Sequence, residues 1–323
     1  MRLKNRCRVA VLTGGPSNEH DVSVSTGKMV MQNLNTRRYR ATEIRIQQNG
    51  RWQFLPNRKT YLLPKALQEL LHRKFDVGFI ALHGAFGEDG KIQALLESVG
   101  LPYTGSGVTA SATAMDKATS NAVFHALGLR VPQYTVLRKD EQAPEKIHFP
   151  IIIKPLQGGS SVGITIARTQ ASVQGALRKV FREDSRVMLQ QYIRGRELTC
   201  GVLEKQGEPF ALTPTEIIPR STNFFDYKAK YQTGGSKEIT PPRLSKAWIR
   251  QIQAAALAAH RALGCRGMSR TDFILSKNVL YVLELNTIPG MTATSLLPQE
   301  AAHDGFSFSA MLDLIVAAAL RRS

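Results

Sequence analysis

The sequence is poor in cysteine and has no long apolar run. Its 323 residues include three cysteines, Cys7, Cys200 and Cys265, which are far apart and lack metal-ligand spacing. We expect them to be structural thiols of a cytoplasmic protein, where the environment is reducing. No stretch approaches the roughly 20 apolar residues of a membrane span, and the run from Val9 to Leu12 is too short for a signal peptide. The sequence therefore predicts neither a disulfide scaffold nor a membrane partner.

Acidic residues are also scarce, with 25 Asp and Glu against 43 Lys and Arg, a formal net charge of +18. Such an excess raises the possibility of nucleic-acid binding, because basic surfaces attract phosphate backbones. The basic residues are scattered from Arg2 to Arg322, however, and there is no zinc-finger spacing or aromatic-basic RNA motif. We therefore expect no nucleic-acid partner.

The first third of the chain repeats the order strand, glycine turn, helix. A buried strand over Arg8–Leu12 precedes Gly14-Gly15 and a helix that opens near Ser17. A second strand, Val77–Leu82, precedes a glycine-rich turn and a helix that continues through Glu97. This order is typical of a parallel α/β layer that binds ligands at the carboxyl ends of its strands.

The rest of the chain alternates further elements with breaks. Pro102–Gly107 is rich in turn-forming residues and predicts a linker. The remaining predicted elements are helices over Asp116–Leu127, from Pro242 to Gly264 and over Leu312–Leu320, and strands over Ile151–Lys154, Ser269–Leu275 and Val279–Leu285.

The last two predicted strands carry polar residues at alternate positions. Arg270 shares a strand face with Asp272, and Glu284 shares one with Asn286. A three-residue loop, 276–278, would place Arg270 opposite Glu284 and bring all four side chains to one surface. Two carboxylates and an amide oxygen suit Mg²⁺. An exposed sheet face with an Arg–Glu surface pair explains the same residues, so the pattern alone leaves both readings open.

Two further segments, a glycine-rich loop and a long polar stretch, are candidates for parts of a binding site. The loop 158–163 follows a strand that ends near Lys154, and such loops let backbone N–H groups approach phosphate oxygens. It is not a Walker loop, and a hairpin tip is the alternative. The long polar stretch between Pro219 and Pro241 is typical of an active-site lid.

Seven stretches together resemble the D-alanine–D-alanine ligases, a family of the ATP-grasp fold. They span nearly the whole chain in the expected order: GGPSNEHDVS (14–23), ALHGAFGEDG (81–90), LPYTGSGVTASATAMDK (101–117), IKPLQGGSSVG (153–163), FDYKAKY (225–231), GCRGMSRTD (264–272) and LELNTIPGMTATSL (283–296). The resemblance implies an α/β fold of three domains, with an N-terminal parallel α/β domain over 1–105. A central domain over 106–189 and a C-terminal domain over 190–323 would clamp ATP between them.

The resemblance also implies the site residues. The implied metal ligands, for two Mg²⁺ or Mn²⁺ ions, are Asp272, Glu284 and Asn286. The implied ATP contacts are Lys117, Lys154, Ser160, Ser161, Gln190, Gln191, Ile193, Glu197 and Lys230. The implied catalytic residues are Glu19, Ser160, Tyr231 and Arg270, of which the first three form a hydrogen-bonded trio. The implied substrate contacts are Glu19, His83, Lys230, Arg270, Gly290, Ser295 and Leu296.

This sequence departs from the family's pattern around the nucleotide. Many members have a glutamate followed by a lysine where this chain has Gln190-Gln191, at the position that reads the adenine amino group. A Gln oxygen can accept the same hydrogen bond. Gly158 also replaces a residue that is often acidic.

The implied activity is ATP-dependent formation of D-alanyl-D-alanine for peptidoglycan synthesis, through an acyl phosphate. The implied partner is the small molecule D-alanine, and the family suggests a homodimer. Two other enzymes remain alternatives: a depsipeptide ligase with D-lactate as second substrate, and a ligase for other amino acids. Lys230-Tyr231 argues against the first. A non-catalytic nucleotide- or nucleic-acid-binding module is disfavoured by the intact metal and lysine positions.

Overall fold

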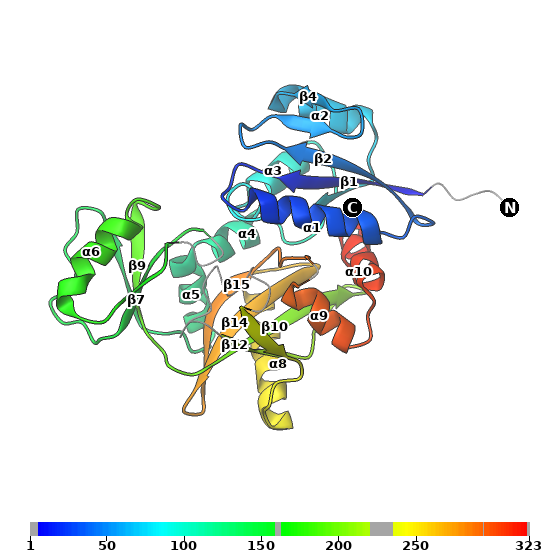
Figure 1. Ribbon diagram of the computed structural model, residues 1–323. Coiled ribbons are helices and arrows are strands. Elements are labelled where there is room, and N and C mark those ends of the chain that lie inside the picture. The colour runs from blue at the N-terminus through cyan, green and yellow to red at the C-terminus, as the bar shows by residue number, and fades with distance from the viewer. Residues whose placement is uncertain (1–5, 159–162, 220–234, 293, 322–323) are drawn as a thin grey trace.

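The computed structural model describes residues 6–158, 163–219, 235–292 and 294–321. Four of the implied site residues, Ser160, Ser161, Lys230 and Tyr231, lie outside these ranges, as does the predicted lid sequence 225–231. Within the described ranges the strands form three sheets, and helices pack on all of them (Figure 1).

The N-terminal sheet has the strand order β4-β3-β2-β1-β5, in which β1, β2 and β5 are parallel. Its strands are β1 (Cys7–Gly14), β2 (Tyr39–Ile46), β3 (Trp52–Phe54), β4 (Lys59–Tyr61) and β5 (Val77–Ile80). Its helices are α1 (His20–Asn33), α2 (Leu63–His72) and α3 (Lys91–Ser98). The predicted parallel α/β layer is confirmed, and the carboxyl ends of β1 and β5 run into the two predicted glycine turns.

The central sheet is antiparallel and has the order β6-β9-β7-β8. Two helices, α4 (Val108–Met115) and α5 (Lys117–Ala126), lead into it. Its elements are β6 (Tyr134–Arg138), β7 (Ile151–Pro155), β8 (Thr165–Ala167), α6 (Gln170–Val180) and β9 (Arg186–Gln191). Apolar residues of β7 and β9 pack against α6, which gives this sheet a hydrophobic cluster of its own.

The C-terminal sheet has the order β13-β12-β10-β14-β15, and β11 pairs with β10 beside this path. Its strands are β10 (Arg196–Lys205), β11 (Glu208–Ala211), β12 (Thr215–Pro219), β13 (Ser236–Ile239), β14 (Met268–Ser276) and β15 (Val279–Asn286). Its helices are α8 (Lys246–Ala262), α9 (Leu296–His303) and α10 (Phe308–Leu320). Helix α8 packs its apolar stripe onto Cys200, Phe273 and Leu275.

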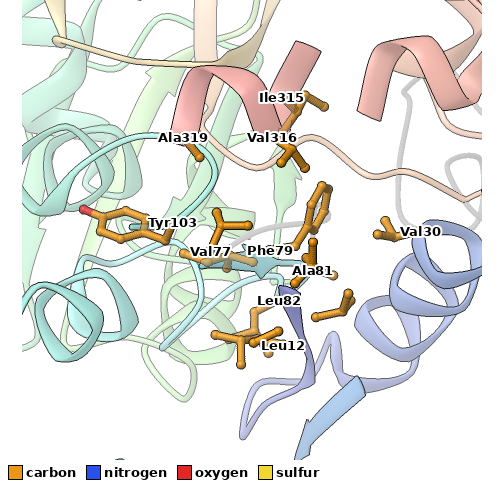
Figure 2. Close-up of a cluster of buried hydrophobic side chains, with 14 of the residues drawn as sticks. Leu12, Val30, Val77, Phe79, Ala81, Leu82, Tyr103, Ile315, Val316 and Ala319 are labelled. Atoms are coloured by element: carbon orange, nitrogen blue, oxygen red, sulfur yellow. The ribbon is translucent and has the colours of Figure 1, made fainter. Parts of the chain in front are cut away.

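The C-terminal helix α10 completes the core of the N-terminal sheet. Ile315, Val316 and Ala319 belong to the same hydrophobic cluster as Val77 and Phe79 of β5. Figure 2 shows these side chains meeting across the interface. The last described helix is therefore packed on the first sheet of the chain, which the amphipathic pattern of a terminal helix does not predict by itself.

The predicted linker at Pro102–Gly107 is partly wrong. Tyr103 is buried and forms a parallel bridge with Gly78, and the Thr104 N–H donates to the carbonyl of Gly78. These contacts continue the N-terminal sheet beyond β5, because the turn-forming residues there pair with its edge strand. The domain boundaries remain a prediction; β9 crosses the proposed division at 189/190.

None of the helices described is by itself long and apolar enough to cross a membrane, and α9 and α10 reach that length only as a pair bent by 106°.

Candidate active site

The hairpin β14–β15 has a different turn from the predicted one. Ser276 pairs with Val279, so the loop has two residues, and both Lys277 and Asn278 have positive φ. Continued without interruption, this register would turn Glu284 away from the face of Asp272. The predicted three-residue loop is therefore wrong.

A β-bulge restores the predicted surface. The register shifts between Phe273 and Asp272, so that Phe273 pairs with Val282 but Asp272 pairs with Glu284, with Leu283 as the extra residue. A bulge of this kind re-aims the side chains that follow it. As a result Asp272 lies opposite Glu284, and Arg270 lies opposite Asn286 instead of the predicted Glu284.

Arg270 and Asp272 form a bidentate ion pair on this surface. The Arg270 Nε and Nη2 groups donate to Oδ1 and Oδ2 of Asp272 at 2.9 and 2.8 Å. Burial is the largest single influence and would lower the pKa of Arg270, but the charge and hydrogen bonds of Asp272, together with the charges of Glu300 and Glu284, outweigh it and raise the pKa above that of a free guanidinium. Thr199 also donates to Asp272 Oδ1, at 2.7 Å, so the carboxylate is held on both sides.

The oxygens of Asp272, Glu284 and Asn286 are chemically suited to a hard divalent cation. Asp272 and Glu284 are cross-strand neighbours, and Asn286 Nδ2 lies 3.5 Å from Asp272 Oδ2. Among the described residues no group of three His, Cys, Asp or Glu could hold a metal, so a metal here would depend on the Asn286 amide as third ligand. Carboxylate and amide oxygens are ligands that Mg²⁺ accepts.

A small cavity of about 30 Å³ joins this surface to α5. Its lining includes Glu284, Asn286, Lys117 and Gly158. Lys117 is buried and its Nζ donates to the carbonyl of Gly158 at 2.7 Å, at the start of the glycine-rich loop. Lys154, on β7, is buried as well. Lys117 thus contacts the start of the loop from α5, and Lys154 is buried on the strand that precedes the loop.

A larger cavity of about 560 Å³ lies between the central and C-terminal sheets. Ile152 of β7 and Ile274 of β14 line it, together with Ile193, Glu197 and Arg168. Apolar side chains from two sheets with a few polar groups at the edge are typical of a small-molecule site. The structure therefore brings Ile193 and Glu197, both implied ATP contacts, into one cavity.

Gln190 and Gln191 point to opposite faces of β9, as neighbours on a strand do. Gln190 is buried and pairs with Ile152, a residue of the 560 Å³ cavity. Gln191 instead lines a separate hollow of about 820 Å³, where its Oε1 accepts a 3.4 Å hydrogen bond from the Gln133 N–H. Neither Gln190 nor Gln191 is thus among the residues that line the cavity of Ile193 and Glu197.

On the N-terminal side, Glu19 is the N-cap residue of α1 and is buried. The turn after β5 packs against it: Gly84 has φ +69°, and a Cβ there would lie 2.6 Å from Glu19 Oε2. His83 is also buried, with Nε2 2.8 Å from Thr26 Oγ1. Burial lowers the pKa of His83 to about 4, and the charge of Arg270 acts in the same direction. The N-terminal residues therefore face the C-terminal hairpin.

Glu88 also belongs to this junction; the sequence leaves its role open between a site residue and a structural turn residue. Burial, and then the charge of Glu19, raise the pKa of Glu88 above that of a free glutamate. It lines the 30 Å³ cavity beside Lys117, and its Oε2 accepts a hydrogen bond from the Gly84 N–H. Its position in the glycine-rich turn after a parallel strand was the available signal, but turn acids often have structural roles.

Three further implied substrate contacts, Gly290, Ser295 and Leu296, lie in the segment that leads into α9 and at its first residue. A Cβ on Gly290 would come 2.9 Å from Ser295 Oγ, so these two residues are adjacent. Ser295 Oγ accepts a hydrogen bond from the Thr292 N–H at 2.9 Å, and Leu296 begins the helix. A buried acid further along α9, Glu300, is absent from the sequence prediction because nothing in its spacing marks it.

Comparison with known proteins gives matches over almost the whole chain. The family model described as "D-ala D-ala ligase C-terminus" matches residues 123–317, and the one described as "D-ala D-ala ligase N-terminus" matches 8–70 and 55–106. A D-alanine–D-alanine ligase of Leptospira interrogans is 38% identical over 349 residues, covering 98% of this chain and 99% of that protein.

Solved structures are similar over the same length. The VanG D-Ala:D-Ser ligase of Enterococcus faecalis has a TM-score of 0.83 at 29% identity, covering 97% of this chain and 99% of that one. A D-alanine–D-alanine ligase of Bacillus anthracis, complexed with ATP, has a TM-score of 0.80 at 30% identity, covering 98% of each chain. The chain belongs to the D-alanine–D-alanine ligase family and has its ATP-grasp fold.

Proposed function

We propose that the chain joins two D-alanine molecules at the expense of ATP and so forms the D-alanyl-D-alanine dipeptide for peptidoglycan synthesis. The observation that carries the proposal is the convergence of Arg270 and its acidic neighbours with Lys117 and with the N-terminal pair Glu19 and His83. A ligase of this family needs phosphate, metal and amino-acid contacts at one place, and these residues come from all parts of the chain.

The first half of the reaction makes the substrate carboxylate reactive. A carboxylate is a poor electrophile, so its oxygen attacks the γ-phosphorus of ATP, the bond to the ADP oxygen breaks, and an acyl phosphate forms. Phosphoryl transfer needs chiefly positioning and charge neutralisation. Lys117 and Lys154, both buried and next to the glycine-rich loop, would bind the phosphates, and Ile193 and Glu197 would contact the adenosine.

We further propose that Asp272, Glu284 and Asn286 hold two Mg²⁺ or Mn²⁺ ions. Their oxygens share the bulged face of the hairpin, and the adjoining cavity of about 30 Å³ is large enough for an ion or a water molecule. Bound there, divalent cations would supply neutralisation of phosphate charge. The chain contributes carboxylate and amide oxygens that lie on one face of the hairpin.

In the second half, the amine of the second D-alanine attacks the acyl carbon and inorganic phosphate leaves. The carbonyl oxygen gains negative charge in the transition state, and Arg270 with the backbone N–H of Gly290 would stabilise it. Ser295 and Leu296 would bind the carboxylate of this second substrate together with Lys230. Glu19 would position the first D-alanine through its trio with Ser160 and Tyr231, and His83 would line the first subsite.

The acyl phosphate must be kept from water, which a closed lid would do. The predicted lid over 225–231 and the loop serines Ser160 and Ser161 are our candidates for that closure. We also propose a cytoplasmic homodimer, as the family suggests, and three domains, with the last boundary moved to follow Gln191 so that β9 stays in its sheet.

A D-alanine–D-serine ligase is the second candidate function. It is favoured by the high structural similarity to the VanG D-Ala:D-Ser ligase, at a TM-score of 0.83. Both activities share the first half-reaction and differ only in the nucleophile, so the site near Ser295 and Leu296 would decide between them.

The test is ATP-dependent phosphate release by the purified protein with D-alanine, L-alanine, or D-alanine plus D-lactate or D-serine. We expect phosphate release with D-alanine alone and none with L-alanine. Adding D-lactate or D-serine to D-alanine should change the rate of release little. Release that does not depend on D-alanine would refute the proposal, and a mixed product made in preference to the dipeptide would establish the second candidate.

A further inference from the structure

Glu300 is a fully buried acid in the middle of α9. Its exposed fraction is 0%, and Leu296, Leu297 and Ala301 of the same helix are buried with it. Acids are rarely buried completely unless they are paired or hydrogen-bonded, because burial disfavours the charged form. A buried acid near a proposed reaction centre therefore calls for a specific contact.

The contact is made to the backbone of the C-terminal sheet. The Gly201 N–H donates to Glu300 Oε2 at 2.6 Å, and Gly201 is the residue that pairs with Arg270 across β10 and β14. Glu300 thereby links α9, whose first turn carries Ser295 and Leu296, to the strand pair that carries Arg270.

Gly201 lacks a Cβ where the helix comes close. A Cβ added there would lie 2.7 Å from Glu300 Oε2 and 2.5 Å from Leu297 Cδ1, and real side chains do not approach so closely. The glycine on β10 and the acid on α9 are thus complementary: one leaves the space and the other makes the hydrogen bond.

The charges at this contact are compatible with a hydrogen-bonding role for Glu300. Burial raises the pKa of Glu300, and the hydrogen bond from Gly201 and the charge of Arg270 oppose that rise. Glu300 also contributes, after Asp272, to the raised pKa of Arg270, so the two groups are electrostatic neighbours.

We propose that Glu300 is a positioning residue that anchors α9 to β10 and so fixes the distance between the second-substrate residues, Ser295 and Leu296, and Arg270. This inference rests on the proposed ligase function. The attacking amine must be held close to the acyl carbon, and small misplacements of a reactant have large effects on rate. Loss of the anchor therefore weakens use of the second D-alanine more than that of the first.

The experiment compares Glu300→Gln with Glu300→Ala. An amide oxygen accepts the Gly201 hydrogen bond in nearly the same volume, whereas alanine removes the acceptor. Kinetics over a wide D-alanine range give the Michaelis constants of both subsites, and positional isotope exchange in oxygen-labelled ATP reports acyl phosphate formation alone. Gly201→Ala tests the same contact from the other side.

Glu204→Ala is the matched control. The Glu204 Oε2 atom accepts a hydrogen bond from the Gly267 N–H at 2.8 Å. The variant therefore removes a carboxylate–backbone hydrogen bond of β10 that does not involve α9. We expect it to keep both Michaelis constants within about twofold of the wild type. If Glu300→Ala does not yield folded protein, Glu300→Asp, which is one methylene shorter, replaces it.

We expect the Michaelis constant of the second D-alanine to rise about tenfold or more in Glu300→Ala and Gly201→Ala, with isotope exchange nearly unchanged. We expect Glu300→Gln to behave like the wild type. The inference would be overturned if folded Glu300→Ala had the wild-type Michaelis constant for the second D-alanine. It would also be overturned if Glu300→Gln were impaired as much as Glu300→Ala. Because wild-type turnover is measured in parallel, failure of the proposed function would be seen separately.

Discussion

Arg270 is a largely buried charged residue of the site that is held by several contacts. It is held by both oxygens of Asp272, it lies across from Asn286, and its charge acts on His83 in the N-terminal half. A guanidinium fixed in this way needs little reorganisation when negative charge develops nearby, which is the condition for effective transition-state stabilisation.

Replacing Arg270 by alanine should abolish ligation while ATP binding stays nearly intact. Loss of one oxyanion donor typically lowers kcat by about a hundred- to a thousandfold. Arg270 does not line the 560 Å³ cavity that we propose for the nucleotide, so ATP affinity measured by calorimetry should change little. Arg38→Ala, which breaks the exposed ion pair with Asp313, is the control and should keep full activity. Normal turnover by Arg270→Ala would contradict the assigned role.

His260 connects pH to stability. It is buried under the C-terminal sheet with Nδ1 2.7 Å from Ser269 Oγ, and burial lowers its pKa to about 4. The unfolded chain, with an ordinary histidine pKa, binds more protons below about pH 6.5, so stability is full above that pH and falls as pH decreases toward 4.

The variant His260→Asn should flatten this dependence. Asparagine can still reach Ser269 but does not titrate, so the loss of unfolding free energy between pH 7 and pH 5 should shrink by about 2 kcal/mol. Denaturant unfolding at both pH values measures it. An unchanged pH dependence in the variant would show that His260 is not protonated on unfolding over that range.

At the scale of elements, the hairpin β14–β15 shows what the sequence can and cannot predict. Alternation predicts that Arg270 and Asp272 share a face, and the structure confirms it, because strand periodicity is local. The turn length and the bulge at Leu283 are not predictable from alternation. Val282 before the bulge and Leu285 after it both belong to the hydrophobic cluster that includes α8, and no local pattern specifies contacts with a distant helix. The correct surface was thus predicted from an incorrect register.

The turn of this hairpin is not optimal for its backbone. Lys277 and Asn278 have φ values of +46° and +62°, which Asn-Gly adopts more readily. The double variant Lys277→Asn, Asn278→Gly should therefore stabilise the protein by about 0.5–1 kcal/mol against denaturant and leave kcat unchanged. A loss of stability would mean that the lysine side chain makes a contact that outweighs the strain.

At the scale of the whole molecule, the chain closes on itself through α10. The sequence predicts a closing helix over Leu312–Leu320, and the structure confirms it over Phe308–Leu320. Its packing partner, β5, lies more than two hundred residues earlier, and no periodicity specifies a contact at that separation. The hydrogen bond between Glu300 and Gly201 was not predicted for the same reason. The two residues are far apart in the sequence and come into contact only because α9 packs on β10.

Ile315→Ala should therefore destabilise the N-terminal sheet. Ile315 is fully buried against it, and truncation of a buried isoleucine costs about 2–5 kcal/mol. Hydrogen exchange should speed up in β1 and β5 and stay unchanged in β7 and β9, which belong to a separate cluster. Leu320→Ala, at a partly exposed position on the same helix, is the control. Equal acceleration in all sheets would contradict this packing.

The central claim is that all these parts assemble one ligase site, and product stoichiometry tests it most directly. Purified protein with D-alanine, ATP and Mg²⁺ should form one D-alanyl-D-alanine for each ADP, measured by mass spectrometry of the dipeptide and by ADP release in the same sample. ADP formed without dipeptide, or at a rate independent of D-alanine, would contradict the account.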